Sequence, residues 1–322
     1  MRKLAHNLLV PIALALANWP GQAQAWGPEG HEIVARLASY YLTPAARERV
    51  EEILGSQRLY DYEVASWPDL IRGTKEYEAI YPGNGSWHFV DFNATQYYDD
   101  TFELKPPADG QDIVTQVHRW HDVLAFGDIT PEQRLDALRF LVHFTGDIHQ
   151  PLHCAYRYGD MGGNMIPVHS FQGRHFVTGP DTEQDYTSSI HSVWDDAMVR
   201  ELMAGKKPAA AAKELRQAIP DEQLAKWRTD DPLQWAVDSY WRARKEVYRW
   251  TNGEKLPFKW SGPGMDLTSE NYIDSHLPIV REQLQKAGVR LGHLLNLAFD
   301  PAYAAAYKPA PKAKAKPAPT AK

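Results

Sequence analysis

The sequence predicts an all-α protein with one mainly helical domain, and two observations carry this prediction. Apolar residues recur at intervals of three and four over long stretches, which is the spacing of an amphipathic helix. Segments with the alternating pattern of strands are few and short. No internal repeat is visible, and helical stretches run through the whole body of the chain, so we expect a single domain over residues 26–307.

The individual helices follow from periodicity and from their end signals. Thr43 is a good N-cap residue and Pro44 suits a first helical turn, whereas Pro151 should end the helix that precedes it. Only residues 87–92 and 175–178 have the character of short strands or extended segments. In chain order, we expect helices over residues 29–41, from Thr43-Pro44 onward, from Pro68 onward, and over 111–124, 131–150, 188–203, 209–218, 232–247 and 269–297.

The first 25 residues have the pattern of an export signal. A basic start is followed by the apolar run Leu8–Ala17, which is too short for a comfortable membrane span, and then by the small-x-small sequence Ala23-Gln24-Ala25. Cleavage there makes Trp26 the mature N-terminus and predicts a secreted or periplasmic protein, the alternative being an uncleaved anchor. At the other end, residues 308–322 alternate Lys, Ala and Pro, which indicates a flexible tail.

Charge and cysteine content narrow the function classes. The leader and the tail together carry seven basic residues and no acidic ones, so removing them from a net charge of −6 leaves −13 on the body. This is not the broad basic surface of an electrostatic nucleic-acid binder, so any such activity needs local cations, which bound metal could supply. The single cysteine, Cys154, cannot form an internal disulfide.

Histidine and aspartate recur in a pattern that suits a metal site. His143 and Asp147 lie four residues apart on one expected helix, and His191 and Asp195 repeat this spacing on another. His153 follows the proline break and can turn back toward the first pair. A single pair of this kind is also an ordinary hydrogen bond on a helix surface, but two pairs and a further histidine favour a metal, and imidazole with carboxylate suits zinc.

Three earlier motifs extend this pattern. They are Trp26-Gly-Pro-Glu-Gly-His31 at the expected cleavage point, Asp69 in Trp-Pro-Asp-Leu-Ile-Arg, and His88 in Trp-His-Phe-Val-Asp-Phe. With these motifs in this order, the sequence resembles the S1/P1 nuclease family and its zinc phospholipase C relatives. The resemblance runs from Trp26 to about Asp195, and more weakly to about residue 300, and it implies the mainly helical fold of the phospholipase C/P1 nuclease type.

The resemblance implies three zinc ions. Asp69, His88, His143 and Asp147 would hold the first ion, and His153, His191 and Asp195 would hold the second. Trp26 would hold the third through its free α-amino nitrogen and its carbonyl oxygen, together with His31 and Asp147. Asp147 would then bridge two ions. Zinc lowers the pKa of bound water toward about 7, which suits hydrolysis of a phosphodiester near neutral pH.

The resemblance also implies roles in substrate handling. Asp69 would orient the attacking water and Arg72 would stabilise charge on the phosphate. Phe89 would stack on a base and Asp91 would hydrogen-bond its edge, which favours unpaired strands. Asn164 belongs to a turn, Gly162-Gly163-Asn164, that also matches the family. The structural alternatives are a salt-bridging Arg72, a core Phe89 and a plain turn.

We therefore expect a secreted, zinc-dependent endonuclease. It would hydrolyse single-stranded RNA or DNA to 5′-phosphorylated products, accept 3′-nucleotides, act as a monomer and have no stable association with membranes. One alternative is a zinc phospholipase C, but that family's pattern has Glu where this chain has Asp195, and the pair Phe89 and Asp91 suits a base pocket. A second alternative is a zinc-binding protein without catalysis, which should lack Arg72 and the base pocket.

Overall fold

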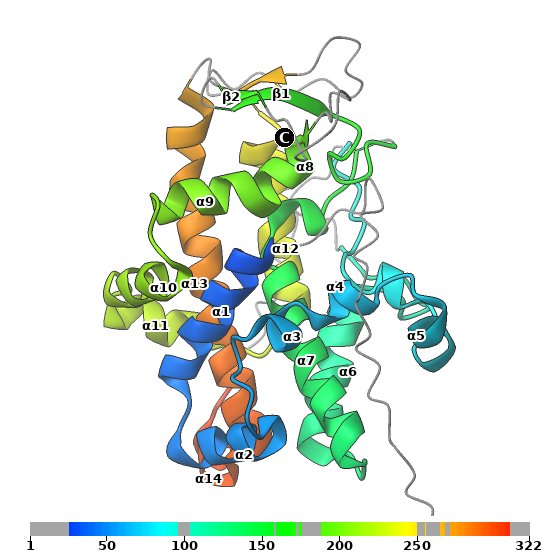
Figure 1. The fold of residues 1–322 in the computed structure, drawn as a ribbon, viewed down its shortest axis with the longest axis vertical. Coiled ribbons are helices and arrows are strands. Elements are labelled where there is room, and N and C mark those ends of the chain that lie inside the picture. The colour runs from blue at the N-terminus through cyan, green and yellow to red at the C-terminus, as the bar shows by residue number, and fades with distance from the viewer. Residues whose placement is uncertain are drawn as a thin grey trace, which may run out of the picture.

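Helices make up most of the chain that the structure describes, as the sequence predicts (Figure 1). The computed structural model describes residues 26–95, 104–157, 159–171, 174–175, 188–249, 255, 265–267 and 271–309. The expected signal peptide and all but the first two residues of the expected tail lie outside these ranges.

The helices follow one another through short connections. They are α1 (Pro28–Tyr41), α2 (Pro44–Leu54), α3 (Tyr62–Ala65), α4 (Trp67–Ile71), α5 (Lys75–Ile80), α6 (Ile113–Phe126), α7 (Pro131–Asp147), α8 (Ile190–Ser192), α9 (Met198–Met203), α10 (Pro208–Gln217), α11 (Asp221–Trp227), α12 (Pro232–Arg242), α13 (Tyr272–Phe299) and α14 (Pro301–Ala306). Two 3₁₀ segments, η1 (Asn84–Ser86) and η2 (Pro151–His153), and two π-helical segments, η3 (Val193–Ala197) and η4 (Ala243–Val247), complete the set.

Local end signals explain where α2 and α7 begin. The Thr43 side chain accepts a hydrogen bond from Ala46 N at 3.2 Å, ahead of a proline in the first turn of α2. Thr130 and Gln133 exchange hydrogen bonds as a capping box at the start of α7. These caps supply partners for backbone N–H groups that have none inside the helix.

The end of α7 differs from the expectation, because this helix stops at Asp147 and not at residue 150. Beyond it the backbone tightens, and His149 N donates to Gly146 O at 3.0 Å while Gln150 N donates to Asp147 O at 2.9 Å. Pro151 has no N–H and disfavours a helical conformation in the residue before it, so the break falls one turn earlier than the proline itself.

The long helix α13 is the centre of the packing. Figure 1 shows α1 lying against it, with α6 and α7 alongside, and these helices contact one another. A Cβ at Gly288 of α13 would lie 2.2 Å from Leu37 Cβ of α1, so the two helices approach too closely for any larger residue there. Neither α13 nor any other helix among the described residues is long and apolar enough to span a membrane.

A small sheet lies at one end of the molecule, at the top of Figure 1. It consists of β1 (Pro167–Phe171), β2 (Arg174–His175), β3 (Ser188–Ser189) and β4 (Met265–Asp266), in the order β2-β1-β3 with β4 parallel to β1. Of its strands, the sequence indicated only the one at His175. The expected strand over 87–92 is an extended segment, joined to the chain near Tyr156 by backbone hydrogen bonds.

Candidate metal centre

The last turns of α7 supply two residues of the centre. His143 and Asp147 lie one helical turn apart on the same face, and both side chains are fully buried. His143 Nδ1 donates a hydrogen bond to Ala65 O at 2.9 Å. This bond leaves the lone pair on Nε2, which lies 3.3 Å from Asp147 Oδ2.

Two further residues converge on this pair from α4 and from the extended segment after η1. His88 Nδ1 lies 3.0 Å from Asp147 Oδ2 and 3.2 Å from His143 Nε2. Asp69 Oδ1 lies 3.6 Å from the same atom of His88 and 3.5 Å from His143 Nε2. The four residues that the sequence grouped as one ligand set are therefore together in the structure.

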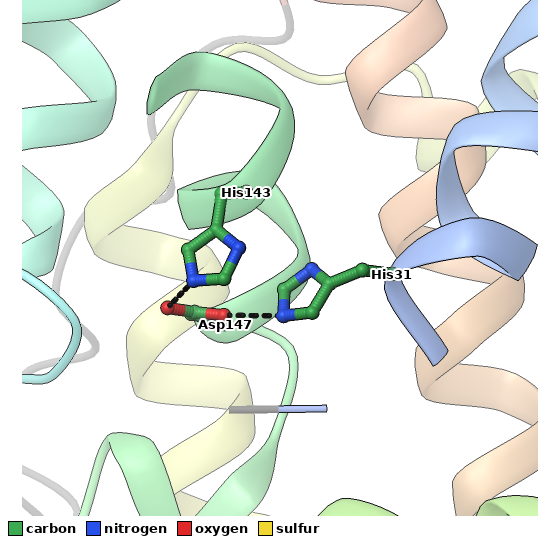
Figure 2. A group of neighbouring side chains, drawn as sticks. All are labelled: His31, His143 and Asp147. Carbon is green, nitrogen blue, oxygen red and sulfur yellow. Dashed lines mark ion pairs between the residues drawn. The ribbon is translucent and has the colours of Figure 1, made fainter. Parts of the chain in front are cut away.

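The helix α1 brings His31 to the other side of Asp147. His31 Nε2 lies 3.2 Å from Asp147 Oδ1, and Figure 2 shows the carboxylate between the two imidazoles, with one oxygen toward each. Trp26 is fully buried and lies beside Gly146, whose Cβ, if present, would be 3.8 Å from Trp26 Cδ1. The segment that begins at Trp26 thus reaches the cluster, and the role of its α-amino group stays a prediction.

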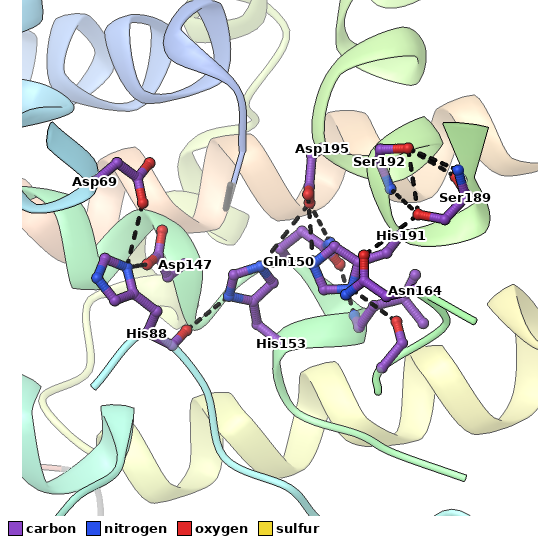
Figure 3. A network of polar contacts seen from close by, with 12 residues as sticks. Asp69, His88, Asp147, Gln150, His153, Asn164, Ser189, His191, Ser192 and Asp195 are labelled. Atoms are coloured by element: carbon purple, nitrogen blue, oxygen red, sulfur yellow. Dashed lines mark hydrogen bonds and ion pairs between the residues drawn. The ribbon is translucent and has the colours of Figure 1, made fainter. Parts of the chain in front are cut away.

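A second group of three residues lies next to the first (Figure 3). His191 Nε2 is 3.1 Å from His153 Nε2 and 3.4 Å from Asp195 Oδ2. His153 Nδ1 donates to His88 O at 2.6 Å, which ties the two groups together, and His191 Nδ1 donates to Gly162 O at 2.7 Å. Both histidines therefore present Nε2 to the interior of the group.

The backbone around Asp195 is irregular where the sequence predicted one helix over residues 188–203. Residues Ser188–Ser189 form β3, and η3 is a π-helical segment between α8 and α9. A π segment widens the helix and often occurs at functional sites. Asp195 lies within it, and its carbonyl accepts a hydrogen bond from Gly27 N at 2.7 Å, so η3 also holds the start of the described chain.

Several buried donor atoms in these groups need a cation. Asp147 Oδ1 and Asp195 Oδ2 have no hydrogen-bond partner among the described residues. The Nε2 atoms of His153 and His191 are both lone-pair acceptors yet lie 3.1 Å apart, an approach that is repulsive unless a cation lies between them. Neighbouring ligand atoms of a tetrahedral zinc ion lie about 3.4 Å apart, so the spacing, the burial and the chemistry of these residues fit metal binding.

Ionisation within the first group shows the same demand for positive charge. Burial lowers the pKa of His143, but the carboxylates of Asp147 and Asp69 outweigh it and raise this pKa to about 10. Burial likewise raises the pKa of Asp69, but His143 lowers it to about 2. The two carboxylates thus hold a cation at His143 even when that cation is only a proton, and a metal ion competes for the same place.

Other histidines are held neutral. Burial, with a contribution from the Arg72 cation, lowers the pKa of His88 to about 4. Burial, with a contribution from His153, lowers the pKa of His191 to about 3. Neutral imidazole is the form that binds metal, so these side chains are ready ligands at neutral pH. Burial raises the pKa of the Asp195 carboxyl, as expected for a buried acid that has no bound cation beside it.

A pocket of about 140 Å³ opens onto the second group. Arg72, Phe89 and Asp91 line it on one side and His153 and His191 on the other, with Leu152, Met161 and Gly162 completing the wall. Phe89 is half-buried and not part of the core, so its ring is available from the pocket. Gly162, and not Asn164, reaches the pocket wall; Asn164 Nδ2 instead donates to Met161 O at 2.9 Å.

Two residues of the centre were not singled out from the sequence. Gln150 Nε2 donates to Asp195 Oδ1 at 2.5 Å, while its Oε1 accepts from Leu152 N at 2.6 Å, which fixes the orientation of the carboxylate. Gly146 leaves room for His31, because a Cβ there would lie 2.8 Å from His31 Nδ1. The position of Gln150 immediately before Pro151, within the histidine motif, was the available signal for the first.

Comparison with known proteins agrees with this geometry. The family model for S1/P1 Nuclease matches residues 26–300. Nuclease P1 of Penicillium citrinum is 29% identical over 286 residues, which cover 84% of this chain and 97% of the fungal protein. Nuclease S1 of Aspergillus oryzae is 28% identical over 306 residues, covering 90% and 97%. Endonuclease 2 of Arabidopsis thaliana is 25% identical over 309 residues, covering 92% and 99%. Since the family match spans most of the chain, the protein belongs to the S1/P1 nuclease family and is a nuclease.

Proposed function

We propose that this nuclease is a zinc-dependent endonuclease that cuts single-stranded RNA or DNA to 5′-phosphorylated products and also removes phosphate from 3′-nucleotides. One observation carries the proposal. The pocket that contains Arg72, Phe89 and Asp91 shares its wall with His153 and His191. A base, its phosphate and two metal ligands can therefore meet in one small space, which is the arrangement that phosphodiester cleavage beside a bound base requires.

Base recognition in this proposal depends on Phe89 and Asp91. A half-buried aromatic ring on a pocket wall offers a stacking surface, and base stacking on such a ring contributes about 1–3 kcal/mol with little dependence on sequence. A base inside a duplex is already stacked on its neighbours, so the pocket favours unpaired strands. The carboxylate of Asp91, two residues along the same extended segment, accepts hydrogen bonds from the base edge.

Phosphate handling depends on Arg72 and Asp69. The Arg72 cation lies close enough to the metal groups to lower the pKa of His88, after the larger effect of burial, and it lines the pocket. It binds the phosphate and stabilises the negative charge that grows on it during cleavage. Asp69 is nearly buried and sits beside His88 and His143, where it accepts a proton or hydrogen bond from the attacking water.

The metal set proposed for this site is three zinc ions. Asp69, His88, His143 and Asp147 hold the first, His153, His191 and Asp195 the second, and Trp26, His31 and Asp147 the third. Zinc supplies a Lewis acid and a water of lowered pKa, and it neutralises charge on the leaving oxygen. The support from the chain is the set of buried, unpartnered donor atoms and the histidines held in the neutral form.

We also propose that residues 1–25 are a signal peptide and that the mature enzyme starts at Trp26 in the periplasm or the medium. Support comes from the sequence pattern, and from the burial of Trp26 beside the first group. A single chain supplies every residue of the proposed site, so we propose a monomer. Mass spectrometry of the exported protein and its elution in size-exclusion chromatography test these two statements.

The activity is tested on the mature, metal-loaded protein. Single-stranded and double-stranded RNA and DNA are digested with and without a chelator, and release of phosphate from a 3′-nucleotide is followed alongside elemental analysis. We expect zinc, a strong preference for single strands, and loss of both activities with the chelator. Hydrolysis of phosphatidylcholine without nucleic-acid cleavage would instead point to a phospholipase, and zinc without either activity to a binding protein.

A further inference from the structure

A second pocket, of about 80 Å³, is lined by an unusual concentration of positive charge. Four of its seven lining residues are cations, namely Arg157, Arg244, Arg249 and Lys255, and none of the seven is acidic. The body of the chain carries a net charge of −13, so such a cluster does not follow from composition. We call these four residues and the space between them the basic pocket.

Two of the arginines are held in fixed positions. Arg157 is nearly buried, stacks over the ring of Tyr248 at 3.9 Å, and donates through Nε to Asp160 at 3.1 Å. Arg244 donates to the hydroxyl of Tyr240 at 3.1 Å. An arginine whose plane is already oriented loses little entropy when it binds a phosphate. Asp160 offsets part of the positive charge, but its carboxylate does not line the basic pocket.

The basic pocket is joined to the catalytic pocket by two paired segments of chain. Residues 88–95 run beside residues 153–157, with Val90 N donating to His153 O at 2.8 Å and Ala94 N donating to Tyr156 O at 2.8 Å. At one end these segments carry the metal-group residues His88 and His153. At the other end Ala94 and Arg157 line the basic pocket.

The distance between the two pockets follows from this pairing. Asp91 lines the catalytic pocket and Ala94 the basic pocket, three residues further along an extended segment. At about 3.3 Å per residue this is a separation of about 10 Å, which a few nucleotides of a single strand can span. A strand whose base lies on Phe89 can therefore place a neighbouring phosphate among the four cations.

We propose that the basic pocket binds a backbone phosphate of the nucleic-acid substrate, a few nucleotides from the scissile bond. This inference rests on the proposed endonuclease function. It explains how an acidic protein holds a polyanion, because local cations replace the missing broad basic surface. It also implies that longer substrates bind more tightly than a dinucleotide, which cannot occupy both pockets.

The test is a pair of charge-matched double variants. Arg249→Gln with Lys255→Gln removes two cations of the basic pocket, and the control, Arg49→Gln with Lys213→Gln, removes two exposed cations from α2 and α10. Zinc content and thermal unfolding establish that each variant is folded. KM and kcat are measured for a single-stranded decanucleotide over a range of salt, and for a 3′-nucleotide.

We expect the basic-pocket variant to raise KM for the decanucleotide about three- to tenfold and to leave the 3′-nucleotide unaffected. The slope of log KM against log salt should fall by about 0.7 for each phosphate that no longer meets a cation. Replacing single phosphates by methylphosphonates should reveal one position that raises KM in the wild-type enzyme and has no effect in the variant. The control variant should behave as wild type.

Equal KM values for both variants would overturn the proposal. If inorganic phosphate binds wild-type protein and fails to bind the basic-pocket variant while decanucleotide KM is unchanged, the pocket holds free phosphate, and the proposal is also wrong. A wild-type enzyme that cleaves no nucleic acid would contradict the proposed function separately. The pocket is then judged by fluorescence anisotropy of the labelled decanucleotide on the same three proteins.

Discussion

The imidazole of His31 is stacked on that of His143, with ring centroids 4.0 Å apart and planes inclined by 15°. Both rings contact Asp147, so α1 and α7 meet through three side chains at the centre of the proposed site. The close approach depends on Gly146, since a Cβ at this position would lie 2.8 Å from His31 Nδ1. The stacked rings are therefore sensitive to a single added methyl group.

Gly146→Ala should displace His31 and with it the third metal ion. We expect the loss of about one zinc of three by elemental analysis and a clear fall in kcat, while α7 keeps its helical structure because Ala favours helices. Gly85→Ala is the matched control, because a Cβ there meets nothing within 4 Å. Unchanged zinc content in Gly146→Ala would show that His31 can move without loss of metal.

Asp147→Ala should be the most damaging change among the ligands. It removes the carboxylate that contacts His31, His88 and His143 together, so two ions lose a ligand at once. We expect about three zinc ions in the mature wild-type chain and one or fewer in the variant, with Glu132→Ala on the same helix as control. An active wild-type enzyme with a single ion would contradict the three-ion proposal.

Phe89→Ala should weaken substrate use more than folding. One stacking interaction with a base contributes about 1–3 kcal/mol, so its removal corresponds to about a 5- to 150-fold rise in KM for a single-stranded substrate. Zinc content and the unfolding temperature should stay close to wild type, because the ring is half-buried on the pocket wall. A variant that unfolds would assign Phe89 to the core and remove the basis of the base pocket.

Full activity should require a free amino group at Trp26. An amide nitrogen is a poor zinc ligand because its lone pair is delocalised, whereas an α-amine with a pKa of about 7.7–8.0 loses its proton to zinc near neutral pH. We compare purified protein that starts at Trp26 with protein that retains a blocked extension. The extended form should contain less zinc and turn over more slowly. Equal values in both would leave Trp26 as an ordinary buried aromatic residue.

The acid stability of the fold should depend on His293, which lies away from the metal groups. This side chain is 1% exposed and lies against Tyr303 and Tyr307. Burial lowers its pKa from 6.5 to about 4. Between these values the unfolded chain binds a proton that the folded chain does not, so stability is lost as the pH falls below 6.5.

His293→Gln cannot take up this proton. Between pH 7 and pH 5 the wild-type free energy of unfolding should therefore fall by about 2 kcal/mol more than that of the variant. Urea denaturation at both pH values measures the difference, and the comparison of slopes removes any constant cost of the substitution. Parallel pH dependence in the two proteins would mean that His293 is protonated as readily in the folded state.

Much of the fold and of the centre could be predicted because the signals are local. The four-residue spacing of His143 and Asp147 places both on one helical face, whatever surrounds them. Caps such as Thr43 likewise act within a few residues. The family resemblance grouped the remaining ligand candidates, and the structure brings His31, Asp69 and His88 to the same carboxylate.

What could not be predicted depends on tertiary contacts. The π-helical turn at Asp195 is stabilised where Gly27 and Gln150 bind its backbone and side chain, and no periodicity reports such contacts. The strands β3 and β4 have two residues each, too few to give an alternating pattern. The basic pocket gathers cations from positions as distant as Arg157 and Lys255, which only folding brings together.

The close packing of α1 on α13 bears on when the enzyme first becomes active. Leu37 meets Gly288 across 251 positions of chain, so the first helix has its main partner only after nearly the whole polypeptide has been made. Contacts this distant in sequence form late, because a long loop must close before they repay its entropy. His31, carried by α1, therefore reaches Asp147 only in a finished chain. A ribosome-bound or partly translocated precursor should thus be unable to degrade the RNA around it.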